Sequence, residues 1–113
     1  MDLEFKTSKL QKQCENPKEA QKKYGPQIGI KLTQRVNELI AALSLEDVSK
    51  NRANGFHDLD GDRNGEFAVT LVHPFRLIFK PIFDNSDSKN DLSSINVVRI
   101  EEVIDYHGKN KRK

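Results

Sequence analysis

The sequence predicts a single small α+β domain, in which helices lie on one face of a mostly antiparallel sheet. Three observations lead to this prediction. A short alternating segment opens the chain, helical patterns fill most of residues 8–50, and alternating apolar segments return after residue 65. The expected order is therefore an N-terminal strand, then helices, then three further strands. All 113 residues are assigned to one domain, 1–113.

The first predicted strand covers residues 2–6, where Leu3 and Phe5 alternate with charged residues. A short helix follows over residues 9–14, with Ser8 as its N-cap. One face of the opening strand is expected to be buried.

Asn16 and Pro17 predict the start of a second helix, as N-cap and first helical residue. Gly25 predicts its end, because glycine readily adopts the left-handed conformation that terminates helices. The second helix is therefore expected to end by Gly25, with Pro26 beyond it.

Pro26 opens the strongest helical pattern in the chain. Arg35, Asn37 and Glu38 fall outside its apolar stripe, so they are expected to face water. A cap over Ser44–Asp47 precedes one more helical turn. The stripe is expected to pack on the sheet and consists of Ile28, Leu32, Val36, Leu39 and Leu43, with Ile40 widening it.

Residues 56–82 predict a loop followed by a β-hairpin. Residues 58–65 are polar and contain two glycines, which is typical of a turn-rich loop. Two alternating strands then flank a break at His73 and Pro74. Phe67, Val69, Leu71, Phe75, Leu77 and Phe79 are expected on one face, and Arg76, Ile78 and Lys80 on the other.

Residues 95–100 predict the last strand, which residues 101–106 either extend or leave by a bend. Residues 84–94 precede it and are expected to form a mobile loop. Residues 108–113 form a basic tail.

Composition limits the class of protein. Apolar residues make up 35% and charged residues 32%, which suits a modest core, and no apolar run is long enough for a membrane span. A single cysteine, Cys14, excludes an internal disulfide, and a cytoplasmic location is expected. The net charge is only +2, but lysines gather in the first third and in the tail, which allows a basic face.

Three groups of residues are candidates for chemistry: His57 with Arg63, Arg76 with Lys80, and the run Asp105-Tyr106-His107. Histidines and arginines suit phosphodiester cleavage that uses a ribose 2′-hydroxyl as nucleophile. Histidine transfers protons near neutral pH, and arginines stabilise charge on the phosphorus. This chemistry requires no cofactor and no metal.

Each candidate also has a structural interpretation. His57 is open to a role as a turn cap, and Arg76 to an ion pair with Glu66 or Glu101 across the sheet. Tyr106 is open to packing as an edge aromatic. The acidic residues of the loop 58–65 resemble part of a calcium loop, but the glutamate that closes an EF-hand is missing.

Two motifs resemble a known family. Residues 57–65 and 66–79, HDLDGDRNG and EFAVTLVHPFRLIF, resemble the pattern H-x-L-x-G-D-R-x-G…R-[IL]-x-F of plasmid-maintenance killer proteins. These are the HigB-like branch of the RelE/ParE toxin superfamily. Residues 105–107, DYH, resemble the closing motif of that branch. The resemblance covers nearly the whole chain and implies a RelE-like fold.

The resemblance also implies an activity: a toxin of a type II toxin–antitoxin pair that cleaves mRNA in the ribosomal A site. It would make His57 an active-site histidine and would place Arg63 and Arg76 on the scissile phosphate. His107 would transfer a proton, Asp105 would orient it, and Tyr106 would stack on a base. Where many relatives carry a lysine, this chain has Asp60, which repels a phosphate.

The implied partners are the ribosome with its mRNA and a HigA-like antitoxin with a helix-turn-helix domain. Operator DNA would be bound only through the antitoxin complex, and no membrane is involved. Two alternatives stay open. One is a non-enzymatic ParE-like toxin that binds DNA gyrase, and the other is a degenerate member that acts only in antitoxin binding and autorepression.

Overall fold

A computed structural model of the chain describes residues 1–83 and 91–105. The predicted basic tail, and the predicted loop up to residue 90, lie outside the described residues, whereas the end of that loop forms a short 3-10 helix, η3. The elements of the described part are β1 Asp2–Phe5, α1 Ser8–Glu15, α2 Pro17–Tyr24, α3 Pro26–Ala41, α4 Leu45–Lys50, η1 Arg52–Asn54, β2 His57–Asp58, η2 Gly61–Arg63, β3 Phe67–Thr70, β4 Phe75–Pro81, η3 Leu92–Ser94 and β5 Val97–Asp105.

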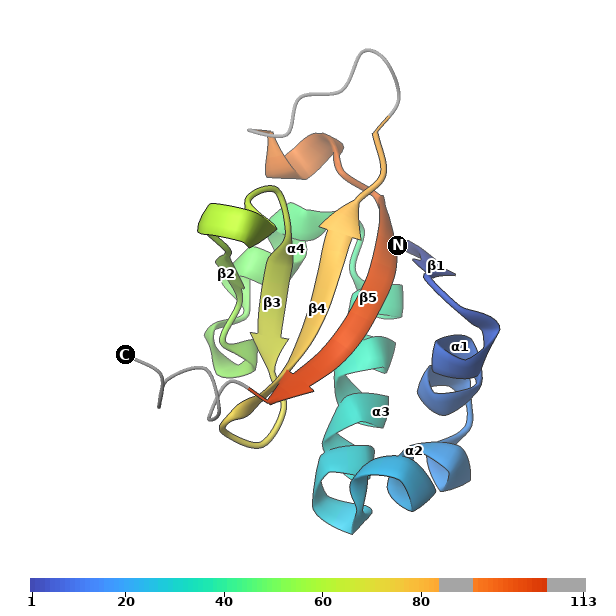
Figure 1. The fold of residues 1–113 in the computed structure, drawn as a ribbon. Helices are drawn as coiled ribbons and strands as arrows, with labels where there is room; N and C mark the ends of the chain where they lie inside the picture. The colour runs from blue at the N-terminus through green and yellow to red at the C-terminus, as the bar shows by residue number, and fades with distance from the viewer. Residues whose placement is uncertain (84–90, 106–113) are drawn as a thin grey trace.

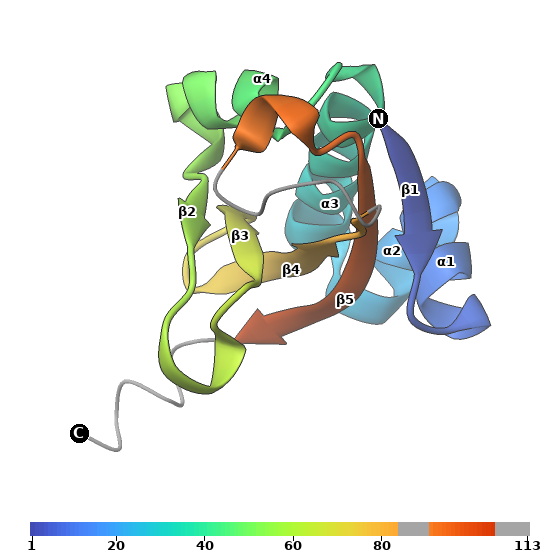
Figure 2. The ribbon, with the colours of Figure 1, turned by 90° about the horizontal axis from the view of Figure 1, so that it is seen from above.

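The strands form one sheet in the order β1-β5-β4-β3-β2 (Figure 1). β1 runs parallel to β5, and every other neighbouring pair is antiparallel. Figures 1 and 2 show α1, α2 and α3 gathered on one side of this sheet. The predicted α+β class, with a mostly antiparallel sheet and helices on one face, is therefore confirmed.

The sheet contains one more strand than the sequence predicted. Residues 57–58 form β2, which pairs with β3, although the polar, glycine-containing pattern from residue 58 onward predicted only a loop. β2 is two residues long, too short to produce a detectable alternation. Residues 101–105 extend the last strand, with a register shift opposite Ile78 and Phe79.

The two faces of the sheet differ in what they bury. The face toward the helices carries the main core, in which Leu32, Leu39, Leu77, Phe79 and Ile100 are fully buried. The opposite face carries a smaller apolar cluster of Leu59, Ala68 and Ile78, with Ile104 packed against it. The alternation predicted for the hairpin is thus confirmed, and the face opposite the helices is left for polar side chains. We call it the open face.

The helix boundaries follow local capping chemistry. Thr7, rather than the predicted Ser8, caps α1, since its hydroxyl accepts a hydrogen bond from the amide of Leu10 at 3.1 Å. The Asn16 side chain caps α2, and Gly25 ends it at a φ of 87°. The predictions for α2 are confirmed, and the cap of α1 is displaced by one residue.

The structure differs from the amphipathic pattern predicted for α3 in two ways: one charged residue is buried, and two apolar residues are exposed. Arg35 was expected to face water but is buried, because its guanidinium reaches backbone carbonyls of neighbouring segments. Ile40 and Leu43 were expected to pack on the sheet but are 53% and 82% exposed. α3 ends at Ala41, so the chain turns before Leu43 reaches the sheet. None of the described helices is long and apolar enough to cross a membrane.

Candidate functional site

His57 and Arg76 come together on the open face of the sheet. In the strand register His57 lies opposite Ala68, and Arg76 lies opposite Thr70, two residues further along β3. Side chains that are two residues apart on a strand share a face. The Arg76 Nη1 and His57 Nε2 atoms are 2.6 Å apart.

The contacts of His57 determine which of its ring nitrogens carries a proton. Nδ1 lies 3.0 Å from the carbonyl oxygen of Gly55, which can only accept a hydrogen bond, so Nδ1 donates. The Arg76 guanidinium can only donate, so Nε2 accepts. In this arrangement both ring nitrogens of His57 are occupied, and the ring is in direct contact with the guanidinium of Arg76.

The backbone before His57 is closely packed. Gly55 has a φ of 67°, and a Cβ atom on it would lie 2.4 Å from the Thr70 hydroxyl oxygen. Asn54 is buried, and its amide side chain donates to the carbonyl of Val48 at 3.0 Å and accepts from the amide of Phe56 at 2.8 Å. Glycine and asparagine at these positions therefore determine where β2 begins.

Arg63 lies in η2 and is held by two carboxylates. Its Nη1 donates to Glu66 at 2.7 Å, and its Nη2 donates to Glu102. Partial burial lowers the pKa of Arg63, but the hydrogen bonds to Glu102 and Glu66 outweigh it, so the pKa lies above the ordinary value for arginine. The guanidinium stays charged and has both ends of its planar fork occupied.

Glu102, which pairs with Arg63, lies on the same face of the sheet as His57 and Arg76. It lies opposite Ile78 in the ladder between β5 and β4, and Ile78 lies opposite Ala68, the partner of His57. These four residues form one row across the sheet, so Glu102 is on the open face together with His57. Sequence reasoning missed Glu102, because the strand assignment of residues 101–106 was left open.

Of the run predicted at the end of the last strand, only Asp105 is described. It is exposed and lies opposite Phe75, next to the pair formed by Arg76 and Ile104. Tyr106 and His107 lie outside the described residues. The structure thus brings His57 and Arg76 into contact and places Arg63 on the same face.

The carboxylates considered as partners for Arg76 have other contacts. Glu66 binds Arg63, and Glu101 accepts a hydrogen bond from Arg99 at 2.6 Å. In the acidic loop 58–65, Asp60 is exposed. Within residues 1–83 and 91–105, no three acidic, histidine or cysteine side chains gather in a way that would hold a metal ion.

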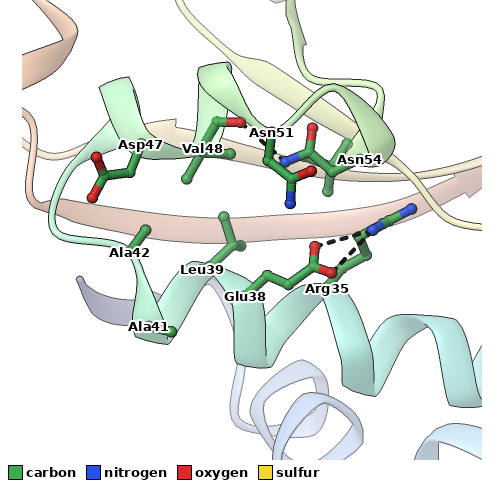
Figure 3. Close-up of a pocket in the computed structure, with 10 residues that line it drawn as sticks. Arg35, Glu38, Leu39, Ala41, Ala42, Asp47, Val48, Asn51 and Asn54 are labelled. Atoms are coloured by element: carbon green, nitrogen blue, oxygen red, sulfur yellow. Dashed lines mark hydrogen bonds and ion pairs between the residues drawn. The ribbon is translucent and has the colours of Figure 1, made fainter.

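A separate pocket of about 320 Å³ lies between α3 and the segment of α4 and η1 (Figure 3). Arg35 and Glu38 form an ion pair at 3.0 Å along its wall. Arg35 also donates to the carbonyl oxygens of Thr70 at 2.8 Å and Ala53 at 3.1 Å. It therefore connects α3 to β3 and to the turn before β2, which makes its role structural, and the predicted site residues do not line this pocket.

The open face carries basic side chains that can bind a negatively charged group. Arg76 is in contact with His57, and Lys80 continues the same face of β4 two residues beyond Ile78. Arginines arranged this way suit phosphate oxygens, because the planar guanidinium matches their geometry.

The chain was compared with known families, curated proteins and solved structures. No family model matches the sequence, and no curated protein matches it. Among solved structures, the chain is similar to a YoeB/ParE toxin from Agrobacterium tumefaciens, with a TM-score of 0.46, 16% sequence identity, and coverage of 93% of this chain and 94% of that chain. No activity and no residue role follows from a similarity at this level.

Proposed function

We propose that this protein is the toxin of a toxin–antitoxin pair and cleaves mRNA on the ribosome. The observation that supports this most directly is the hydrogen bond between Arg76 and His57 on the open face. Both residues belong to the motifs that resemble the HigB-like toxins, and their contact joins the two motifs in space. An arginine held in this way is suited to bind the phosphate at which an RNA chain breaks.

The proposed reaction is an internal transfer at phosphorus. The ribose 2′-oxygen attacks the neighbouring phosphate, and its proton passes to a general base. The bond to the 5′-oxygen breaks, and a general acid protonates that oxygen, leaving a 2′,3′-cyclic phosphate and a 5′-hydroxyl. Arg76 and Arg63 stabilise the extra negative charge on the phosphorane.

The general acid is proposed among the remaining motif residues. His57 is occupied by Arg76 and Gly55, so its role in the proposal is to position Arg76. His107 is the proposed proton donor, with Asp105 orienting it and Tyr106 stacking on a base. In the cell the antitoxin is the proposed inhibitor.

A second candidate function is a toxin that binds a protein target such as DNA gyrase and cleaves nothing. One observation favours it: two carboxylates already neutralise Arg63, which lowers the attraction of this loop for phosphate. Asp60 in the same loop is exposed and adds a further negative charge.

Cleavage of a labelled mRNA by purified protein, with programmed ribosomes and without them, tests the proposal. Arg76→Ala is expected to lower the cleavage rate by about 100-fold, since it removes a group that stabilises the transition state. His107→Gln is expected to abolish cleavage. Lys50→Ala removes one exposed positive charge from α4 and serves as the matched control, with an unchanged rate.

Two variants of His57 separate positioning from proton transfer. His57→Gln keeps a side-chain oxygen that accepts from Arg76, so it is expected to retain more activity than His57→Ala. Equal loss in both variants would contradict the positioning role. If the folded wild-type protein cleaves no RNA in either condition but inhibits supercoiling by gyrase, the second candidate function replaces the first.

A further inference from the structure

The ion pairs of Arg63 span the open face. η2 follows β2 at one edge of the sheet, whereas Glu102 belongs to β5, with β3 and β4 between them. Figure 1 shows β3 and β4 lying between β2 and β5. The contact between Arg63 and Glu102 therefore joins segments 39 residues apart in the sequence.

The two carboxylates differ in how firmly they are held. Glu66 is three residues from Arg63, its side chain is 20% exposed, and its amide also donates to the carbonyl of Arg63 at 2.9 Å. Glu102 comes from a distant strand, and its side chain is 43% exposed. Because water can solvate the Glu102 carboxylate once it leaves Arg63, breaking this ion pair costs less free energy than breaking the one with Glu66.

A phosphate diester needs the part of Arg63 that Glu102 occupies. Bidentate binding of phosphate uses two parallel N–H groups of the guanidinium. In the free protein Nη1 faces Glu66 and Nη2 faces Glu102, so one positive charge is matched by two negative charges. A phosphate approaching this cluster meets net negative charge until one carboxylate leaves.

We propose that Glu102 is an internal competitor of phosphate at Arg63: it binds the guanidinium in the free protein and gives way to a phosphodiester of single-stranded RNA. This inference rests on the proposed function, since it places a phosphate on the open face. In the free protein the Arg63 guanidinium is therefore charged and held in position by its ion pairs, but it binds RNA weakly until Glu102 is displaced. Glu66 stays in place and keeps the η2 turn in position.

Glu102→Gln tests this exchange, because glutamine has nearly the same shape but no charge. The control is Glu46→Gln on α4, where an exposed glutamate also pairs with a cation, Lys50, at 4.0 Å. The probe is a fluorescent single-stranded RNA with 2′-O-methyl sugars, which cannot be cleaved because the 2′-oxygen is blocked, and the full chain is used. Glu102→Gln is expected to tighten binding about threefold or more, since exposed ion pairs are worth a small multiple of thermal energy.

A double-variant cycle identifies Arg63 as the group that is released. Arg63→Met alone is expected to weaken RNA binding, and Glu102→Gln is expected to have no further effect in that background. If Glu102→Gln matches Glu46→Gln, or if its gain persists without Arg63, the proposal is wrong. A lower melting temperature without any gain in binding would also overturn it, because the contact would then be only structural.

Inorganic phosphate separates this proposal from the proposed function. Its binding is followed as the rise in melting temperature of the wild-type protein, Glu102→Gln and Glu46→Gln with increasing phosphate. A larger rise for Glu102→Gln than for Glu46→Gln supports competition at Arg63 even if no variant binds RNA, in which case the nuclease function fails. Equal rises in the two variants would refute the competition.

Discussion

Gly29 offers a test in which two physical effects have opposite signs. It lies within α3, where alanine would be favoured over glycine by about 1 kcal/mol of helix propensity. However, a Cβ atom on Gly29 would lie 2.6 Å from the Cα and backbone nitrogen of Gln21 and 2.8 Å from the carbonyl carbon of Ala20. These are backbone atoms of α2, which no side-chain rotation can move.

The size of the clash decides the expected sign. Ordinary contacts begin at 3.4 Å, so α2 and α3 would have to separate by about 0.8 Å, the difference between 3.4 and 2.6 Å. Overpacking of this kind costs about 1–3 kcal/mol, and the separation also loosens fully buried Ala20. Gly29→Ala is therefore expected to lower the free energy of unfolding by up to about 2 kcal/mol after the gain in propensity is subtracted.

Urea denaturation followed by circular dichroism measures this change. Asn37→Ala, at an exposed position of the same helix, is the control, since it gains helix propensity without a new contact. It is expected to leave the midpoint unchanged or to raise it slightly. A Gly29→Ala protein that is as stable as the wild type, or more stable, would refute the argument that close contact between the backbones of α2 and α3 requires glycine.

Three further predictions concern two buried side chains, Arg35 and Cys14. Arg35→Met is expected to destabilise the protein by about 3 kcal/mol in urea, because the carbonyls of Thr70 and Ala53 lose a charged donor; a loss below about 1 kcal/mol would contradict this. Burial, and secondarily the charge of Glu15, raises the pKa of Cys14 from 9.0 to about 12, so its thiol is expected to react with a disulfide reagent at pH 8 only after unfolding in urea. Because the pKa of Cys14 is higher in the folded than in the unfolded protein, its contribution to stability is complete below pH 9 and is lost as the pH rises through about 12. Cys14→Ala is therefore expected to flatten the fall in the free energy of unfolding above pH 9. An unchanged slope would contradict this reasoning.

The class of fold and most boundaries of its elements could be predicted from the sequence, because local chemistry determines them. Asn16, Pro17 and Gly25 mark the start and end of α2 through capping and backbone conformation. The alternation of Phe75 and Leu77 with Arg76 predicted which face of β4 is buried. The two-residue strand β2 left no such pattern.

The contacts of the candidate site depend on the tertiary structure. That His57 and Arg63 belong together with Arg76 was an expectation from residue types and motif resemblance, but no local pattern states that His57 accepts from Arg76 or that Arg63 is paired with Glu102. These contacts join residues 19 and 39 positions apart, and they arise only when β2 and β5 meet β3 and β4 in register. Short-range chemistry determines the conformation of each segment, whereas the pairing of distant strands determines which charges face one another.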